Sequence, residues 1–90
     1  MIRDQLIREL EYAVENEKTI VLNVSFGENT SCGVSVMFEL YRYDAEDDEI
    51  ILYHGTDLYI ICTKNATISY EDGIYSVYTE SYRFDVEFLS

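Results

Sequence analysis

The residues with the clearest chemical potential are five carboxylates within six positions of the tyrosine-flanked stretch YRYDAEDDEIILYHG. They are Asp44, Glu46, Asp47, Asp48 and Glu49. Calcium loops carry oxygen ligands at alternate positions, and Asp44, Glu46 and Asp48 would be the first, third and fifth. However, the sixth position holds Glu49 where such a loop requires glycine, and the twelfth holds Gly55 where a bidentate glutamate belongs. We therefore interpret the stretch as a solvated charged turn, and we expect no metal or other cofactor.

Catalysis would have to depend on the single histidine, His54, together with one of the two cysteines, Cys32 and Cys62. The spacing of these residues matches no Ser/His/Asp or Cys/His arrangement, so nothing in the sequence orients His54 for proton transfer. The sequence also lacks a phosphate-binding glycine loop and zinc-ligand spacing. We expect a turn histidine, a core Cys62, a loop Cys32 and no enzymatic activity.

Tyrosines on both sides of the acidic stretch offer a different kind of chemistry, which is protein recognition. Tyr41, Tyr43 and Tyr53 have large rigid rings with a polar tip, a combination that is enriched at binding hot spots. Phenol rings beside carboxylates also suit contact with arginine through ion pairing and cation–π attraction. The alternative is that the rings only cap a sheet.

The charge of the chain narrows the range of partners. Eighteen acidic residues against six basic residues leave a net charge of −12 on 90 residues. This charge repels phosphates, so direct binding to nucleic acid or to an anionic membrane is not expected. The charged N-terminal stretch lacks the apolar run of a signal peptide or membrane segment, so a cytoplasmic location is expected, where the two thiols would stay reduced.

The elements that must position these residues are one helix followed by short strands. Apolar residues recur at helical spacing over residues 2–16, as Ile2, Leu6, Leu10, Ala13 and Val14. After residue 18 the period becomes two, which predicts β-strands. The expected strand segments are 19–26, 33–43, 49–54, 57–63, 66–71, 74–78 and 82–89. In the fifth connection, Asp72-Gly73 favours a two-residue hairpin turn that pairs Tyr70 with Tyr75 and Ile68 with Val77.

These elements predict one α+β domain over residues 1–90, with the helix lying on a strongly bent antiparallel sheet of about six strands. A small barrel of the Sm or SH3 sort is an alternative form of the same sheet. Residues 50–53 and 58–62 are apolar on both strand faces, as in strands that are covered on both sides. One short helix covers only part of one face. Barrel closure, a homodimer or another partner is expected to cover the rest.

In its small size, its DAEDDE cluster and its lack of catalytic motifs, the chain resembles small acidic phage-encoded inhibitors. These include anti-CRISPR and anti-restriction proteins, and also the immunity proteins of nuclease toxins. The resemblance implies that the chain occupies a basic nucleic-acid channel on an enzyme. The contacts would be the five carboxylates, with Tyr41, Tyr43 and Tyr53 as anchors. The alternative is a structural or assembly module that forms a homo-oligomer, in which the acidity serves solubility.

Overall fold

An amphipathic helix begins the fold, and its apolar stripe is buried. The computed structural model describes residues 2–27 and 33–89, in which α1 spans Ile2–Glu15. Leu6, Leu10 and Ala13 on this stripe are buried, which confirms the predicted helix and its inward face. Glu17 then adopts a positive φ of 52°, and the amide of Lys18 donates to the carbonyl of Ala13 at 2.8 Å. This left-handed residue ends the helix and turns the chain toward the first strand.

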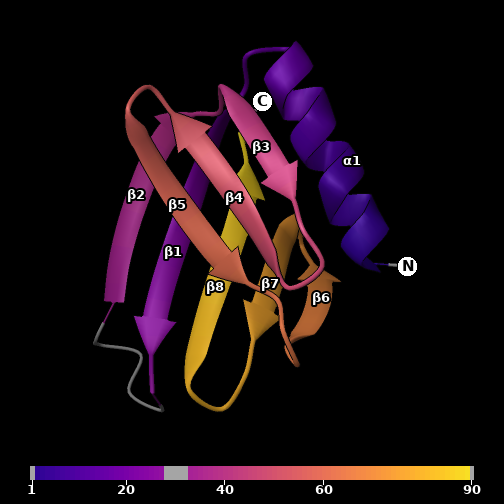
Figure 1. Cartoon of the computed structure of the whole chain (residues 1–90), viewed down its shortest axis with the longest axis vertical. Helices are drawn as coiled ribbons and strands as arrows, with labels where there is room; N and C mark the ends of the chain where they lie inside the picture. The colour runs from indigo at the N-terminus through magenta and orange to yellow at the C-terminus, as the bar shows by residue number, and fades with distance from the viewer. Residues whose placement is uncertain (1, 28–32, 90) are drawn as a thin grey trace.

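The described residues also form eight strands in two antiparallel sheets that pack face to face (Figure 1). A five-stranded sheet has the order β2-β1-β8-β7-β6, and a three-stranded sheet has the order β3-β4-β5. The strands are β1 (Thr19–Phe26), β2 (Gly33–Glu39), β3 (Arg42–Ala45), β4 (Glu49–His54), β5 (Asp57–Cys62), β6 (Thr67–Glu71), β7 (Ile74–Tyr78) and β8 (Tyr82–Phe88). The α+β class is therefore confirmed.

The prediction of one bent sheet or a small barrel is wrong, because the chain changes sheets in the middle of segment 33–43. After β2 the amide of Leu40 donates to the carbonyl of Lys18, whereas the next amide, that of Tyr41, donates to the carbonyl of Tyr53 in β4. The sheets separate here, and neither sheet closes into a barrel. The change also resets the alternation of side chains. Tyr43, expected on the face opposite the apolar residues of β2, instead packs against the core.

The predicted hairpin register is correct. Tyr70 pairs with Tyr75 and Ile68 pairs with Val77 across β6 and β7. Asp72 and Gly73 both have positive φ values, 52° and 83°. A two-residue turn of this kind matches the twist of the strands that it joins, so the Asp-Gly pair fixes the register.

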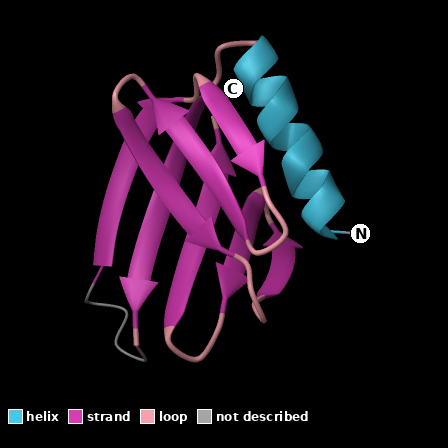
Figure 2. Cartoon of the chain, viewed as in Figure 1, coloured by secondary structure: helices cyan, strands magenta, loops and turns pink. Residues whose placement is uncertain are grey.

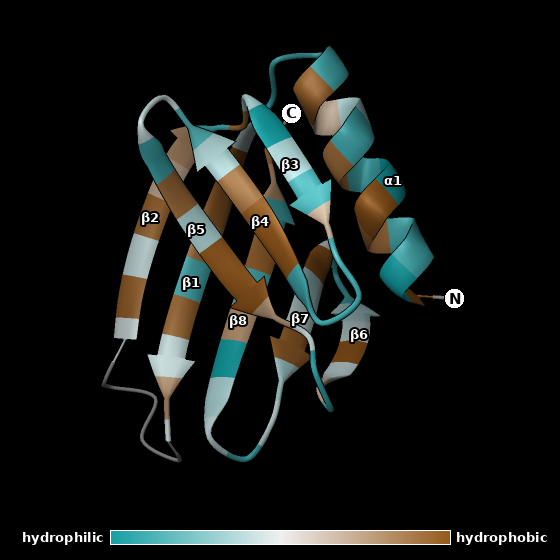
Figure 3. Cartoon of the chain, viewed as in Figure 1, coloured by the Kyte–Doolittle hydropathy of each residue, from teal (hydrophilic) through white to brown (hydrophobic). Residues whose placement is uncertain are grey.

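The core lies between the two sheets and under the helix, and it leaves one apolar surface outside. Ile50 and Leu52 in β4 and Ile61 in β5 are buried against the five-stranded sheet. Leu58 and Ile60 alternate with them, face outward, and are 51% and 50% exposed. Both strands are largely apolar, as the brown segments of β4 and β5 show (Figure 3). Their apolar residues are therefore covered on the inner face only.

The two long edges of this sandwich differ. Helix α1 contacts β3 and β6, the edge strands of the two sheets on one side (Figure 2). The other two edge strands, β2 and β5, have no covering element among residues 2–27 and 33–89. The fold therefore has one closed edge and one open edge.

Candidate protein-binding surface

The acidic stretch forms the turn between β3 and β4, and its backbone is well anchored. The amide of Glu46 donates to the carbonyl of Glu49 at 2.8 Å, and the carbonyl of Asp48 accepts from the amide of Thr63 at 2.8 Å. From the helix, the Arg3 guanidinium donates to the carbonyl of Glu46. The side chains of Glu46, Asp47 and Asp48 stay exposed. Three carboxylates are thus presented to solvent on a fixed turn.

The other two acids of the stretch have local roles. Asp44 accepts a hydrogen bond from the Tyr53 hydroxyl at 2.8 Å, and it lies 3.8 Å from the Arg42 guanidinium. Glu49 begins β4 and is half-buried. The five carboxylates therefore do not act as one uniform cluster, and the unpaired charge is concentrated at the turn.

Acids of the helix extend this charged surface. Burial raises the pKa of the Tyr43 phenol, and the nearby carboxylates of Glu11 and Glu15 raise it further. These two helix residues therefore lie close to β3. We define the acidic surface as Glu11, Glu15, Glu46, Asp47 and Asp48.

The contribution of the helix to this surface was not predicted from the sequence. A signal was present, because Arg3, Ile7, Glu11 and Glu15 follow one another at i, i+4 spacing and so share one side of the helix. The spacing alone did not show which strand that side would meet. The sheet change at Leu40 decides this, since it places β3 against the helix.

The three tyrosines predicted as anchors lie in three different settings. The Tyr43 side chain packs inward, against the core. Tyr41 immediately precedes β3, away from the turn, and is 54% exposed, with its ring 4.8 Å from the His54 ring. Tyr53 lies on the outer face of β4, with the Arg42 guanidinium 4.1 Å above its ring. Of the three, only Tyr53 is bonded to a carboxylate of the stretch.

An apolar surface adjoins these acids on the outside of the three-stranded sheet. We define the apolar outer face as Ile51, Tyr53, Leu58, Ile60 and Cys62, whose side chains alternate with the buried ones. In the register of the sheet, Ile51 is paired with Asp44 of β3 and Cys62 is paired with Glu49 of β4. An apolar centre with a charged rim is the usual anatomy of a protein–protein interface.

The residues considered for catalysis are separated. Cys62 is paired with Glu49 at one end of the β4–β5 hairpin, and His54 is paired with Asp57 at the other end. Cys62 is exposed, so its expected core position is wrong. The reason is that the alternation of β5 places it outward, beside Ile61, which faces the core. The other cysteine, Cys32, lies outside the described residues.

The histidine is engaged in packing. Its Nδ1–H donates to the carbonyl of Glu39 at 2.7 Å, and its ring lies 5.7 Å from the Phe38 ring. It thereby ties the end of β4 to the end of β2. Among residues 2–27 and 33–89, no group of three or more His, Cys, Asp and Glu side chains is placed to hold a metal ion.

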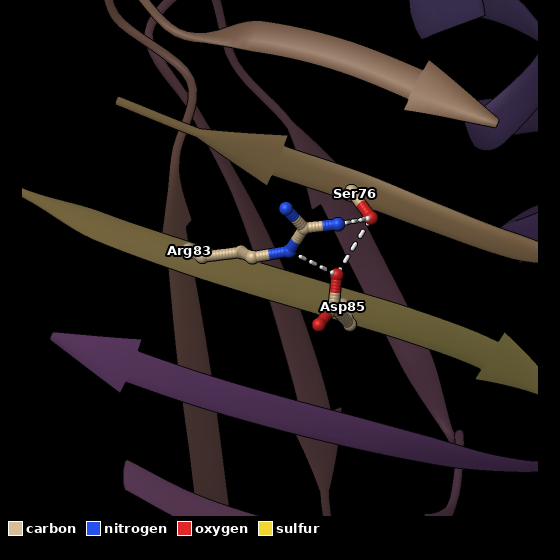
Figure 4. Close-up of polar contacts among 3 residues, drawn as sticks. All are labelled: Ser76, Arg83 and Asp85. Atoms are coloured by element: carbon tan, nitrogen blue, oxygen red, sulfur yellow. Dashed lines mark hydrogen bonds and ion pairs between the residues drawn. The ribbon is translucent and has the colours of Figure 1, made fainter. Parts of the chain in front are cut away.

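A polar cluster occupies the outer face of the five-stranded sheet (Figure 4). The Ser76 hydroxyl donates to the Asp85 carboxylate at 2.6 Å, and Arg83 donates from Nε to the same oxygen and from Nη2 to the Ser76 hydroxyl, each at 3.0 Å. The Arg83 guanidinium also lies 5.3 Å from the centre of the Tyr78 ring. Because each partner is satisfied, the cluster joins β7 to β8 and is not an open site.

Comparison with known proteins gives no relative, because no family model, no curated protein and no solved structure matches the chain. In the part of the chain that the structure describes, no helix is long and apolar enough to cross a membrane.

Proposed function

We propose that this chain is a non-catalytic acidic inhibitor. In this proposal it binds the basic nucleic-acid-binding surface of a nuclease or related defence enzyme, and so acts as a nucleic-acid mimic. The contact comprises the acidic surface and the adjoining apolar outer face of the three-stranded sheet. No cofactor and no direct contact with nucleic acid is involved.

The observation that carries this function is the fixed presentation of charge at the β3–β4 turn. Three hydrogen bonds hold the backbone there, while Glu46, Asp47 and Asp48 remain exposed. A turn whose backbone is already fixed loses little backbone freedom on binding, and a field of one sign accelerates encounter with a basic surface. The apolar outer face can then supply desolvated contacts that slow dissociation.

The amount of charge suits the imitation of nucleic acid. The longest dimension of the molecule is 35 Å. Duplex DNA of that length carries about 20 phosphate charges. The chain has 18 acidic residues and a net charge of −12, which is of the same order.

The test is affinity capture from a host lysate at about 50 mM and about 500 mM salt, followed by purification of the captured protein. The triple variant Glu46→Gln, Asp47→Asn, Asp48→Asn should bind that protein about tenfold more weakly, or worse. A matched control, Glu71→Gln, Asp72→Asn, Glu80→Gln, removes three exposed acids at strand ends and turns of the five-stranded sheet.

Duplex DNA should compete with the chain for the captured protein. The function is contradicted if both triple variants bind like the unaltered chain, or if DNA and the chain occupy the partner together. Salt-insensitive capture would contradict the electrostatic mode of binding as well.

A second candidate function, a homo-oligomeric assembly module, is favoured by the exposed apolar residues Leu58 and Ile60. In that case the three-stranded sheets of two copies cover each other, and the acidity serves solubility. Light scattering separates the two functions, because the module must be an oligomer whereas the inhibitor can act as a monomer.

A further inference from the structure

Strand β5 has a free edge with unpaired backbone groups. It pairs with β4 on one side, and no described strand pairs with its other side. The amide of Thr63 bonds to the carbonyl of Asp48 on the β4 side, whereas the carbonyl of Cys62 accepts from the Tyr82 hydroxyl of β8 at 2.9 Å. Backbone groups of an antiparallel strand alternate between its two sides. The N–H and C=O groups of Leu58 and Ile60 therefore point away from β4, along the free edge.

An apolar ledge that no element of residues 2–27 and 33–89 covers lies beside this edge. Strand β5 crosses the five-stranded sheet diagonally, because Tyr59 stacks on Phe38 at the end of β2, at 4.7 Å, and Cys62 meets Tyr82 at the start of β8. The strands β1 and β2 extend beyond the free edge of β5 (Figure 1).

The corner of the inner face beyond this diagonal is formed by Val24, Phe26, Val34 and Val36, which we call the ledge. Val34 is 59% exposed and Phe26 is 56% exposed, although both belong to the face that carries the core. The three-stranded sheet thus stops one strand short of covering the five-stranded sheet.

We propose that an extended segment of the partner protein adds to the free edge of β5 as a fourth strand. Its alternate apolar side chains would lie over the ledge, and its other side chains would continue the apolar outer face. This mode of binding rests on the proposed function, because it describes how the same partner attaches. Strand addition combines main-chain hydrogen bonds with pockets for alternate side chains.

The charge beside the edge and the net charge of −12 indicate that this segment is basic. Asp57 is exposed at the end where β5 begins, and it is paired there with His54 of β4. Lysine or arginine at the matching end of the added strand would meet this carboxylate.

A second copy of this chain fits the edge less well. If the β5 strands of two copies paired in antiparallel fashion, Asp57 of one copy would lie beside the end of β5 in the other copy. That end lies next to the acidic turn of the second copy. It would also join two bodies that each carry a net charge of −12. Self-association of this kind is opposed by like charge.

The experiment is a selection of random twelve-residue peptides on the folded chain, with Ile60→Pro as the discriminating variant. Proline removes the Ile60 N–H that the added strand needs, and an edge strand tolerates proline where its N–H faces solvent. Selected peptides should alternate apolar residues, carry lysine or arginine at one end, and bind Ile60→Pro about tenfold more weakly.

A second variant addresses the ledge without altering the backbone of β5. Val34→Lys places a charge on the ledge, and Met37→Lys is its matched control, since Met37 is 66% exposed on the opposite face of the same strand. Val34→Lys should weaken peptide binding about tenfold, whereas Met37→Lys should leave it unchanged. Circular dichroism and thermal melting establish that each variant is folded.

Equal binding of the selected peptides to the unaltered chain, Ile60→Pro and Val34→Lys would overturn the strand addition. So would the selection of purely acidic peptides, or a stable dimer whose Leu58 and Ile60 amides are already protected from exchange. The salt-sensitive capture of a basic protein tests the proposed function through the acidic turn. If capture succeeds while Ile60→Pro and Val34→Lys leave it unchanged, only the strand addition fails.

Discussion

The closed and open edges of the sandwich differ in how their apolar edge strands are covered. At the closed edge, α1 covers β3 and β6 and buries Leu6 and Leu10 to 1% exposure or less. At the open edge, β2 and β5 leave Val34 and Leu58 more than half exposed. Uncovered apolar edge strands promote unwanted association, and proteins usually protect them. A chain that protects one edge with its single described helix and leaves the other edge apolar has a surface suited to a partner.

The two edges also differ in charge. The helix that closes one edge brings Glu11 and Glu15 toward Tyr43 of β3, the strand that leads into the acidic turn. Among the described residues of β2 and β5, the acids are Glu39, where β2 ends, and Asp57, where β5 begins, and Leu58–Cys62 is a run of uncharged residues. The acidic surface can therefore steer a basic partner, while the open edge and the apolar outer face provide the contacts that hold it.

The largest expected difference between the two edges is in the free energy of unfolding lost when a leucine side chain is truncated at each edge. Leu10→Ala should lower the free energy of unfolding by about 2–5 kcal/mol, because it leaves a cavity under the helix. Leu58→Ala removes the same atoms from a half-exposed site and should cost less than about 1 kcal/mol. Urea denaturation measures both. Equal losses would show that the open edge is packed like the closed one.

Removal of the Tyr82 hydroxyl tests whether its hydrogen bond holds the end of β5 in place at the open edge. Tyr82→Phe deletes the hydrogen bond to the carbonyl of Cys62 and should cost about 1 kcal/mol. The amide of Thr63, which donates to the carbonyl of Asp48, should also exchange faster, since the end of β5 is less restrained. If neither the denaturation midpoint nor the exchange rate changes, then Tyr82 does not fix the end of the free edge.

Alkaline pH should lower the stability of the fold through one tyrosine near each edge. Burial raises the pKa of Tyr43 beside the helix and of Tyr82 beside β5, and the hydrogen bond to Cys62 raises that of Tyr82 further. The folded state therefore favours the neutral phenols. Their contribution to stability is complete below the ordinary tyrosine pKa of about 10 and is lost as the pH rises through the higher folded values.

Thermal melting between about pH 8 and pH 11 checks this expectation. Tyr43→Phe should show a smaller loss of stability across the range than the unaltered chain. A stability that rises above pH 10 would contradict the assigned direction of these pKa values.

The smallest expected effect concerns the link between the helix and the acidic turn. Arg3→Gln weakens the contact with the carbonyl of Glu46 and should lower stability by about 0.5 kcal/mol. The amide of Glu46, which donates within the turn, should then exchange faster. Arg8→Gln, an exposed change on the same helix, is the control and should leave that amide unchanged. An unaltered exchange rate in Arg3→Gln would mean that the turn is held without the helix.

Local patterns in the sequence were sufficient to predict the helix and the strands, but not to predict that the strands assemble into two sheets. The helix stripe and the Asp72-Gly73 register depend on neighbouring residues, and both predictions are confirmed. The sheet change at Leu40 has no local signal, because alternation looks continuous through residues 33–43. It depends on hydrogen bonds to Lys18 and Tyr53, which lie far away in the sequence.

The candidate surface was predictable to a similar extent. The exposed carboxylates Glu46, Asp47 and Asp48 could be read from one stretch of sequence. The inward side chain of Tyr43, the acids of the helix and the free edge of β5 follow from the sheet change, so they required the structure.

The most direct test is amide hydrogen exchange of Ile60 in the free chain and in the complex with its captured partner. Its N–H lies on the free edge, whereas the N–H of Ile61 points to β4 and is the internal control. We expect Ile60 to exchange rapidly in the free chain and to become protected in the complex, while Ile61 stays protected in both. Protection of Ile60 in the free chain, or rapid exchange of Ile60 in the complex, would contradict a partner-binding open edge.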